Sequence, residues 1–203
     1  MLSIKKRQEY LKYIGLYNGE ITGKEGPLTK KAYLDLQKKY MPKEEQDGIY
    51  GHNTEIALMN AYRVKKYCKH FKLEEFKCEC NGKYCTRYPD TISIRLLKNL
   101  EKSRDHLNVP MTITSGLRCP RWNTICGGAA YSKHMYGQAV DFVSSKTKTF
   151  EARKKFINWY IKLYGSRYAY QYKYGRTKTH TYTGTNPMCN YPEMGNAIHI
   201  DVK

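Results

Sequence analysis

Two histidines and an aspartate lie in or beside two segments that alternate between apolar and polar residues. His134 precedes the segment QAVDFV, which contains Asp141, and His199 lies in AIHIDV near the end of the chain. Alternate side chains of a strand share one face, so each segment directs its bulky apolar residues one way and its ionisable residue the other. Two histidines and a carboxylate on one face can supply three ligands to a zinc ion and leave a fourth position for water, as in catalytic zinc sites.

The flanking sequence predicts the elements that position these residues. Pro110 introduces an alternating strand, which Gly116 ends. A helix is expected from about residue 91 to 107, and another from about 150 to 164, because their apolar residues recur on one face. Helices and strands follow one another without a regular βαβ order, which favours an α+β domain built on an antiparallel sheet.

The first part of the chain contains an internal repeat, in which TGKEGPLTKKA (22–32) aligns with DGIYGHNTEIA (47–57). In both copies the two glycines are expected to form a tight turn with positive φ. The threonine of each copy, Thr29 or Thr54, is expected to cap the helix that follows. With a further helix of about residues 4–14, the repeat predicts a three-helix module.

The longer run GLYNGEITGKEGPLTKKAYLDLQKKY resembles the peptidoglycan-binding-like repeat domain that accompanies many wall-degrading catalytic domains. It contains the pattern G-x-x-G-x-x-T-x-x-A and a helical glutamine, Gln37. The resemblance covers about residues 4–62 and implies a wall-binding module. A helical spacer or a dimerisation module is the alternative.

The phrase SGLRCPRWNTICGGAAYSKHMYGQAVDF, together with the late AIHIDV, resembles the zinc D-Ala-D-Ala carboxypeptidase and L-alanyl-D-glutamate endopeptidase family. That family shares its metal-site architecture with the hedgehog signalling fold. The motifs S-G-x-R, S-x-H-x-x-G-x-A-x-D and H-x-D are all present, over about residues 71–203. The resemblance implies one catalytic zinc ion, held by His134, Asp141 and His199. It also implies that Arg118 holds a substrate carboxylate or the oxyanion formed on the scissile carbonyl.

The resemblance leaves the general base open. Relatives usually carry an acidic residue or a histidine two or three positions before the last zinc histidine, and neither position is ionisable in this sequence. Glu193 falls where hedgehog proteins have a glutamate and is the expected base. Asp201 shares the face of His199 and is expected to orient its ring, although the two roles could be reversed. His180 is a third candidate.

Cysteines and tyrosines are the remaining reactive or aromatic features. The seven cysteines are expected to be mostly free thiols, because their number is odd and no export signal is recognisable. The C-x-C spacing in CECNGKYC lacks a second matching pair, which argues against a structural zinc knuckle. Cys119 and Cys126 could pair in oxidising surroundings. A stripe of tyrosines on one expected strand face could line a substrate groove or be covered by a loop: Tyr168, Tyr170, Tyr172 and Tyr174.

The charge balance bears on the partners. Lys and Arg number 36 against 18 Asp and Glu, a net charge of +18, which attracts polyanions. No nucleic-acid recognition motif and no membrane-spanning apolar stretch is present. The expected partners are therefore bacterial peptidoglycan and anionic wall polymers, without nucleic acid or stable membrane association. Without a signal peptide, the enzyme would be made in the host cytoplasm and act at the wall after release through a holin or lysis, like a phage endolysin.

Together these features predict an α+β protein with a small three-helix N-terminal domain (1–63) and a linker (64–70). An antiparallel-sheet zinc peptidase domain of the hedgehog or D-Ala-D-Ala peptidase type follows (71–203). The expected activity is hydrolysis of peptidoglycan peptide stems as an L-alanyl-D-glutamate-type endopeptidase, since a targeting module suits an insoluble polymer. A D-alanyl-D-alanine carboxypeptidase and a non-catalytic zinc-containing wall-binding protein are the alternatives.

Overall fold

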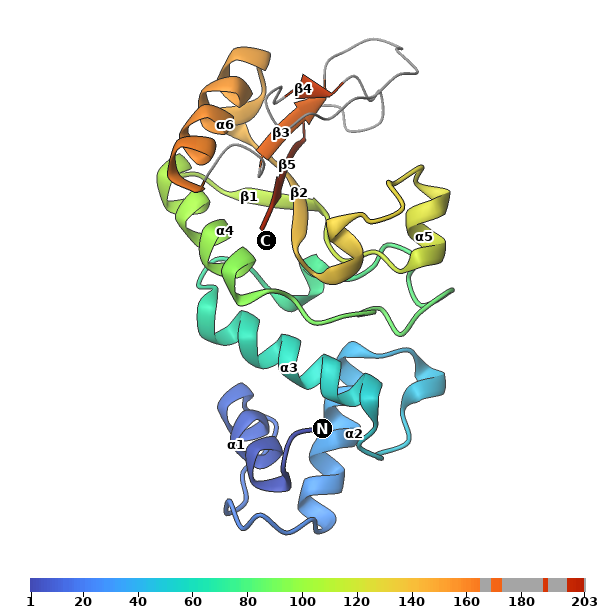
Figure 1. Ribbon diagram of the computed structural model, residues 1–203. Helices are drawn as coiled ribbons and strands as arrows, with labels where there is room; N and C mark the ends of the chain where they lie inside the picture. Colours follow the sequence, from blue (N-terminus) through green and yellow to red (C-terminus); the bar gives the residue numbers. More distant parts are fainter. Residues whose placement is uncertain (165–168, 173–187, 190–196, 203) are drawn as a thin grey trace.

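The structure is a computed structural model that describes residues 1–164, 169–172, 188–189 and 197–202. It combines helices with one sheet, which confirms the α+β class (Figure 1). The helices are α1 (Ile4–Ile14), α2 (Pro27–Tyr40), α3 (His52–Tyr67), α4 (Ile94–Leu107), α5 (Pro120–Ile125) and α6 (Phe150–Tyr164). The strands are β1 (Met111–Ser115), β2 (Ala139–Ser144), β3 (Ala169–Tyr172), β4 (Met188–Cys189) and β5 (Ile198–Asp201).

The sheet has the strand order β1-β2-β5-β3-β4. Figure 1 shows α4 and α6 along one side of it and α5 beyond the other. The apolar residues of the central strands pack towards α6, where the rings of Phe142 and Phe156 meet edge to face with centroids 5.4 Å apart. Val140 and Ile200 are fully buried in the same core. The alternation expected for the two site strands is thus confirmed, and the sheet and helix hold the site strands on one hydrophobic layer.

One strand pair differs from the antiparallel expectation. The pairs β1–β2, β2–β5 and β5–β3 are antiparallel, but β3 and β4 are parallel. Parallel neighbours need a connection of about a dozen residues or more.

The two copies of the repeat form equivalent turns. Gly23 and Gly48 have φ values of +72° and +73°, which confirms the expected left-handed turn. The second glycine of each copy, Gly26 or Gly51, instead has an extended backbone and stands directly before its helix as the N-cap residue. Only one glycine in each copy therefore has a positive φ.

The threonines of the repeat are not the helix caps, and that expectation is wrong. Thr29 and Thr54 lie buried in the first helical turns, where each hydroxyl accepts a hydrogen bond from a glutamine side chain. Gln8 Nε2 donates to Thr29 at 3.1 Å, and Gln37 Nε2 donates to Thr54 at 3.0 Å. The same glutamines accept from the left-handed glycines, with Gly23 N 2.9 Å from Gln8 Oε1. A buried amide from the preceding helix therefore organises each turn.

Helix α3 connects the N-terminal helices to the sheet. Its last turn includes residues 64–67, which were expected to belong to a linker. The Asn60 amide donates to Asp90 O at 2.9 Å and accepts from Ile92 N at 2.7 Å, so α3 fixes the segment before α4. That segment packs directly on Gly137, whose φ is +61° and whose carbonyl accepts from Ser93 N at 2.8 Å. A side chain at position 137 would collide with Thr91 O.

No helix in the described part of the chain is both long and apolar enough to cross a membrane.

Candidate active site

The sheet brings the three expected metal ligands together. Asp141 on β2 and His199 on β5 are directly paired across the antiparallel ladder. Ser115, at the end of β1, pairs with Asp141 from the other side. His134 lies in a short 3₁₀ helix, Lys133–Tyr136, which ends at the left-handed Gly137 just before β2. Strand register and one tight turn therefore determine where the three side chains meet.

The donor atoms converge on one small volume. Asp141 Oδ1 lies 2.8 Å from His199 Nδ1 and 3.3 Å from His134 Nε2, and the two ring nitrogens are 3.2 Å apart. The potential ligand atoms of the three residues all lie within 4.8 Å of one another. All three side chains are buried, with at most 5% of each exposed. Such a convergence of two imidazoles and a carboxylate is the donor set that zinc favours.

Each histidine has a partner for its other ring nitrogen. His134 Nδ1 donates to the carbonyl oxygen of Gly116 at 2.7 Å, so its Nε2 is free of a proton and faces Asp141. His199 Nε2 lies 3.4 Å from Asp201 Oδ2, which directs Nδ1 towards the cluster. Metal-binding histidines normally hold such outer partners, which fix the tautomer and the ring orientation. The residues present therefore fit a zinc ion.

Arg118 contacts the cluster through the aspartate. Its Nη2 donates to Asp141 Oδ2 at 2.9 Å, and its Nε donates to Ser115 Oγ at 2.9 Å. The guanidinium is therefore hydrogen-bonded to the Asp141 carboxylate oxygen that does not face the histidines. In this state Arg118 positions a metal ligand, whereas the family resemblance implied contact with the substrate.

Burial and neighbouring charges set the protonation of the cluster. Burial alone would raise the pKa of Asp141. The charges and hydrogen bonds of His134 and His199 lower this pKa by a larger amount, so the carboxyl is ionised. Burial lowers the pKa of His134, which keeps that ring neutral. Burial also disfavours the charged form of His199, but hydrogen bonds to Asp141 and Asp201 outweigh it and raise its pKa to about 9. Without a metal, His199 is thus an imidazolium between two carboxylates.

The structure places only one of the three candidates for the general base. Asp201 reaches His199, as described above, and its side chain is partly exposed. Glu193 and His180 lie outside the described residues. The tyrosine stripe also cannot be placed, since Tyr168 and Tyr174 lie outside the described residues and only the backbone is described at the two positions between them.

A family model described as Peptidase M15 matches residues 69–171 of this chain. The chain belongs to the Peptidase M15 family. M15 peptidases are zinc-dependent metallopeptidases, which agrees with the donor set of the cluster. The match includes Arg118, His134 and Asp141, whereas His199 lies beyond its end and is brought to the site by the pairing of β5 with β2. A search of curated proteins finds no match.

A second group of potential ligands in this M15 peptidase was not expected. The sulfur atoms of four cysteines lie within 4.8 Å of one another: Cys78, Cys80, Cys85 and Cys119. No disulfide links the six described cysteines outside β4, as expected, and the suggested Cys119–Cys126 pair is absent among them. These two residues flank α5, whose rise separates them by roughly 10 Å. That distance exceeds the Cα separation that a disulfide allows. The sequence feature that could have indicated this group is Cys119, the cysteine of the motif RCP (118–120).

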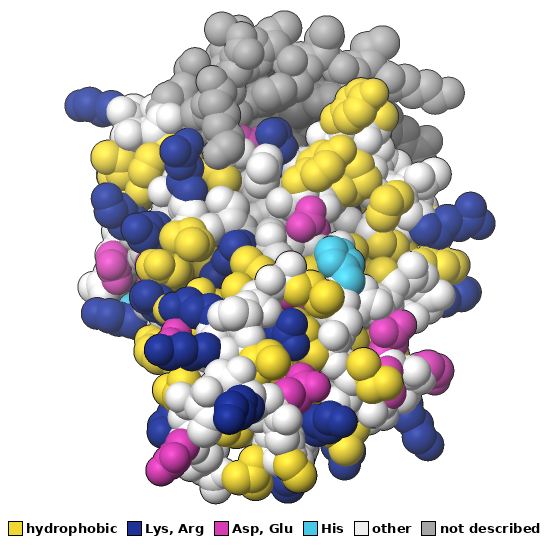
Figure 2. All heavy atoms as spheres, turned by 60° about the horizontal axis from the view of Figure 1, so that its bottom comes forward, with side chains coloured by type: hydrophobic (Ala, Val, Ile, Leu, Met, Phe, Trp, Pro, Cys, Tyr) yellow, Lys and Arg dark blue, Asp and Glu magenta, His cyan; other side chains and the backbone are white. Residues whose placement is uncertain are grey.

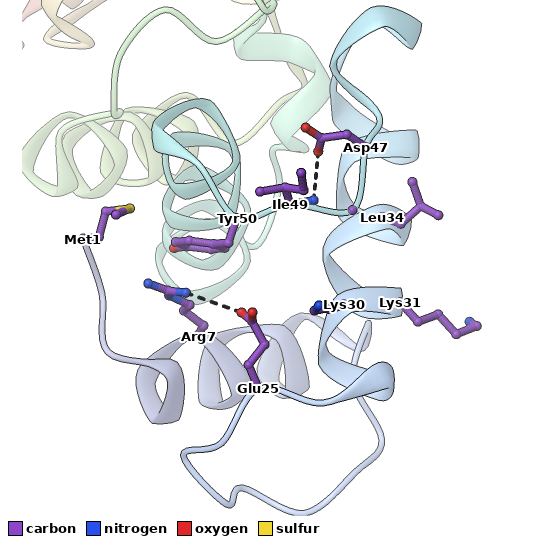
Figure 3. Close-up of a pocket in the computed structure, with 10 residues that line it drawn as sticks. Met1, Arg7, Glu25, Lys30, Lys31, Leu34, Asp47, Ile49 and Tyr50 are labelled. Atoms are coloured by element: carbon purple, nitrogen blue, oxygen red, sulfur yellow. Dashed lines mark hydrogen bonds and ion pairs between the residues drawn. The ribbon is translucent and has the colours of Figure 1, made fainter.

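The N-terminal helices of this M15 peptidase carry a cleft of about 610 Å³. Figure 3 shows Arg7 of α1 beside Glu25 and under the Tyr50 ring, with Ile49 and Asp47 further along the segment that carries Tyr50. The guanidinium carbon of Arg7 lies 3.9 Å from the centre of the Tyr50 ring, and its Nη1 lies 3.7 Å from Glu25 Oε1. On the face seen in Figure 2, Lys and Arg side chains are spread among apolar and acidic ones.

Proposed function

We propose that this chain is a zinc-dependent peptidase that cuts the peptide stems of bacterial peptidoglycan, acting as an L-alanyl-D-glutamate-type endopeptidase. The observation that carries the proposal is the convergence of His134, Asp141 and His199 within 4.8 Å in a chain of the Peptidase M15 family. A zinc ion at this site would polarise the scissile carbonyl and lower the pKa of a bound water molecule.

The protein side chains prepare the site for this chemistry. The Gly116 carbonyl holds the Nδ1 proton of His134, and the Asp201 carboxylate holds the Nε2 proton of His199, so both rings present a fixed nitrogen to the cluster. Arg118 neutralises the outer oxygen of Asp141 and remains close enough to the site to face an anionic substrate group. The 3.4 Å contact of Asp201 with the ring supports an orienting role, and we assign the general base to Glu193.

The N-terminal helices would carry the enzyme to its polymer. In this proposal residues 1–63 form a wall-binding domain, 64–70 a linker that begins with the last turn of α3, and 71–203 the peptidase domain. The cleft at Arg7 and Tyr50 combines a flat aromatic ring with charged groups, a combination suited to a glycan or peptide strand. The net charge of +18 supports attraction to anionic wall polymers. The proposed setting is that of an endolysin, made in the host cytoplasm and acting on the wall after release.

The decisive experiment is mass spectrometry of purified peptidoglycan after digestion by the zinc-loaded protein. New L-Ala carboxyl and D-Glu amino termini are expected, and a chelated sample and the His134→Ala variant should yield none. Loss of a terminal D-Ala alone would instead show a carboxypeptidase. Absence of any zinc-dependent product would contradict the peptidase assignment and favour a wall-binding protein that holds zinc without catalysis.

Two isosteric variants separate the candidate base from the orienting carboxylate. Glu193→Gln should lower kcat by about 100-fold or more, the usual contribution of a general base, and leave zinc affinity unchanged. Asp201→Asn should weaken zinc binding by about 10- to 100-fold and leave kcat near normal in excess zinc. The reverse pattern, measured by zinc titration and steady-state kinetics, would exchange the two roles.

A further inference from the structure

Four cysteines gather beside α5, away from the strands of the sheet cluster. Cys78, Cys80 and Cys85 come from one loop, and Cys119 is the residue directly before α5. Three of them are buried, and Cys85 is half-buried. Four sulfurs bound to one zinc ion at about 2.3 Å lie about 3.8 Å apart. The observed mutual distances, within 4.8 Å and as short as 3.4 Å between Cys80 and Cys85, bracket that spacing.

Backbone amides point at two of these sulfurs. The N–H of Cys119 donates to Cys78 Sγ at 3.4 Å, and the N–H of Trp122 donates to Cys119 Sγ at 3.4 Å. The second bond uses the first turn of α5, where backbone donors are unpaired. Donors in this arrangement stabilise the negative charge of a thiolate, the form of cysteine that binds metals.

The loop that carries three of the cysteines is tightly folded. Asn81, Gly82 and Arg87 all have positive φ, and Cys78 N donates to Arg87 O at 2.7 Å, which closes the loop on itself. The buried residues of this region form a small cluster of their own, made of cysteines and packed against Trp122. A cluster this small buries little apolar surface, so hydrophobic packing contributes little to the stability of the loop. A metal ion is the usual substitute for a hydrophobic core in such a small unit.

We propose that these four cysteines bind a structural zinc ion that is distinct from the one expected in the sheet cluster. Four thiolates complete a tetrahedral shell and leave no position for water, which is the character of structural rather than catalytic sites. The site differs from a knuckle with two C-x-x-C pairs, because its fourth ligand comes from 34 residues further along the sequence than Cys85.

This zinc ion would hold the active-site arginine in place. Cys119 directly follows Arg118, whose backbone N donates to His134 O at 3.1 Å and whose side chain holds Asp141. The neighbouring Leu117 N donates to Phe76 O at 2.9 Å, so the chain just before the cysteine loop is joined to the segment 116–119. The cysteine site therefore fixes one end of the segment that presents Arg118.

The first test uses a double variant, His134→Ala with His199→Ala, which removes the sheet site but leaves all four cysteines. After purification without chelators and reconstitution with zinc, the wild type should hold about two zinc ions per chain and the double variant about one. Replacement of zinc by cobalt in the double variant should give the near-ultraviolet thiolate-to-cobalt absorption and the intense visible bands of tetrahedral cobalt. These readouts do not depend on peptidase activity, so they remain informative if the proposed substrate is wrong.

Cysteine variants provide the matched comparison. Cys78→Ser with Cys119→Ser should lose one zinc ion and the cobalt absorption, whereas Cys126→Ser, at the other end of α5, should keep both. Should the double cysteine variant fail to fold, the cobalt spectrum of the intact cysteine set still decides the matter. The proposal would be overturned if the double histidine variant bound no zinc and showed no thiolate absorption with cobalt. A Cys80–Cys85 disulfide found by mass spectrometry of the native protein would also overturn it.

Discussion

The sheet cluster (His134, Asp141 and His199) and the cysteine cluster (Cys78, Cys80, Cys85 and Cys119) place their ligands by different means. Asp141 and His199 face each other on paired strands, so the ladder of β2 and β5 sets their separation. The loop cysteines depend on several left-handed residues and on a few backbone hydrogen bonds within the loop. The sheet cluster is therefore built on rigid elements, whereas the cysteine cluster is built on a loop that needs its ligand.

The two clusters also differ in how their charges are balanced without a metal. In the sheet cluster Asp141 is paired with Arg118 and with the imidazolium of His199. The thiols of the cysteine cluster instead receive backbone N–H groups and contact one another. Removing the metal should therefore leave the sheet cluster folded but loosen the cysteine loop. The following predictions test that contrast, beginning with the largest effect.

Asp141→Ala should abolish zinc binding and hydrolysis at the sheet cluster while the cysteine cluster keeps its ion. It should also lower the stability of the metal-free protein by about 3–5 kcal/mol, because Arg118 and His199 lose the partner of their buried charges. Zinc analysis and urea unfolding of the chelated protein measure the two effects. A metal-free variant as stable as the wild type would show that the sheet cluster is not held by its own charges.

Cys119→Ser should act on the sheet cluster at a distance. It removes a ligand of the loop ion and frees the residue that follows Arg118, so kcat/KM should fall by about 10- to 100-fold, as small displacements of catalytic groups do. The ion in the sheet cluster should remain. Cys126→Ser is the control and should retain kcat/KM, and equal activity of the two variants would mean that the clusters are independent.

Zinc binding should release different numbers of protons at the two clusters. At the sheet cluster the Nδ1 proton of His199 must leave, and its pKa is about 9. Zinc affinity should therefore rise about tenfold per pH unit from pH 6.5 to 8.5 and level off above 9, with about one proton released per ion. At the cysteine cluster a hydrogen bond with Cys78 raises the pKa of Cys85, and burial raises the pKa of Cys119, so at least two protons per ion should be released at pH 7. Calorimetry in buffers of different ionisation enthalpy separates the two, and a pH-independent affinity at the sheet cluster would contradict the proton assignment.

The sheet cluster could be predicted from the sequence, whereas the cysteine cluster could not. Alternation within a strand is a local property, so the side to which Asp141 and His199 each point was predictable strand by strand, and the family resemblance implied that they share one metal. Cys119 and Cys78 are 41 residues apart, and no periodic pattern relates a loop to a helix start. Only the fold brings them together, so the spacing within CECNGKYC could not indicate the fourth cysteine of the cluster.

In the repeat, too, features set by neighbouring residues could be predicted, whereas features set by tertiary contacts could not. Positive φ at Gly23 and Gly48 was predictable because glycine adopts it at little cost, although Gly26 and Gly51 have the same freedom and are extended. The roles of Thr29 and Thr54 were not predictable, since their partners Gln8 and Gln37 come from preceding helices. A glutamine in the helix before each repeat copy was the available signal. The parallel β3–β4 pair was likewise set by the tertiary structure rather than by either strand's sequence.

Ser115→Ala should have the smallest effect and would show how much of the sheet cluster depends on Arg118 alone. The Ser115 hydroxyl accepts from Arg118 Nε, and its loss leaves one donor of a largely buried guanidinium unpaired while the bond to Asp141 remains. We expect a loss of about 1.5 kcal/mol in stability and a fall in kcat/KM of less than about tenfold. Thr114→Ala, an exposed position on the same strand, is the control and should change stability by less than about 0.5 kcal/mol. If Ser115→Ala reduced activity as much as Cys119→Ser, the orientation of Arg118 would depend on β1 rather than on the cysteine loop.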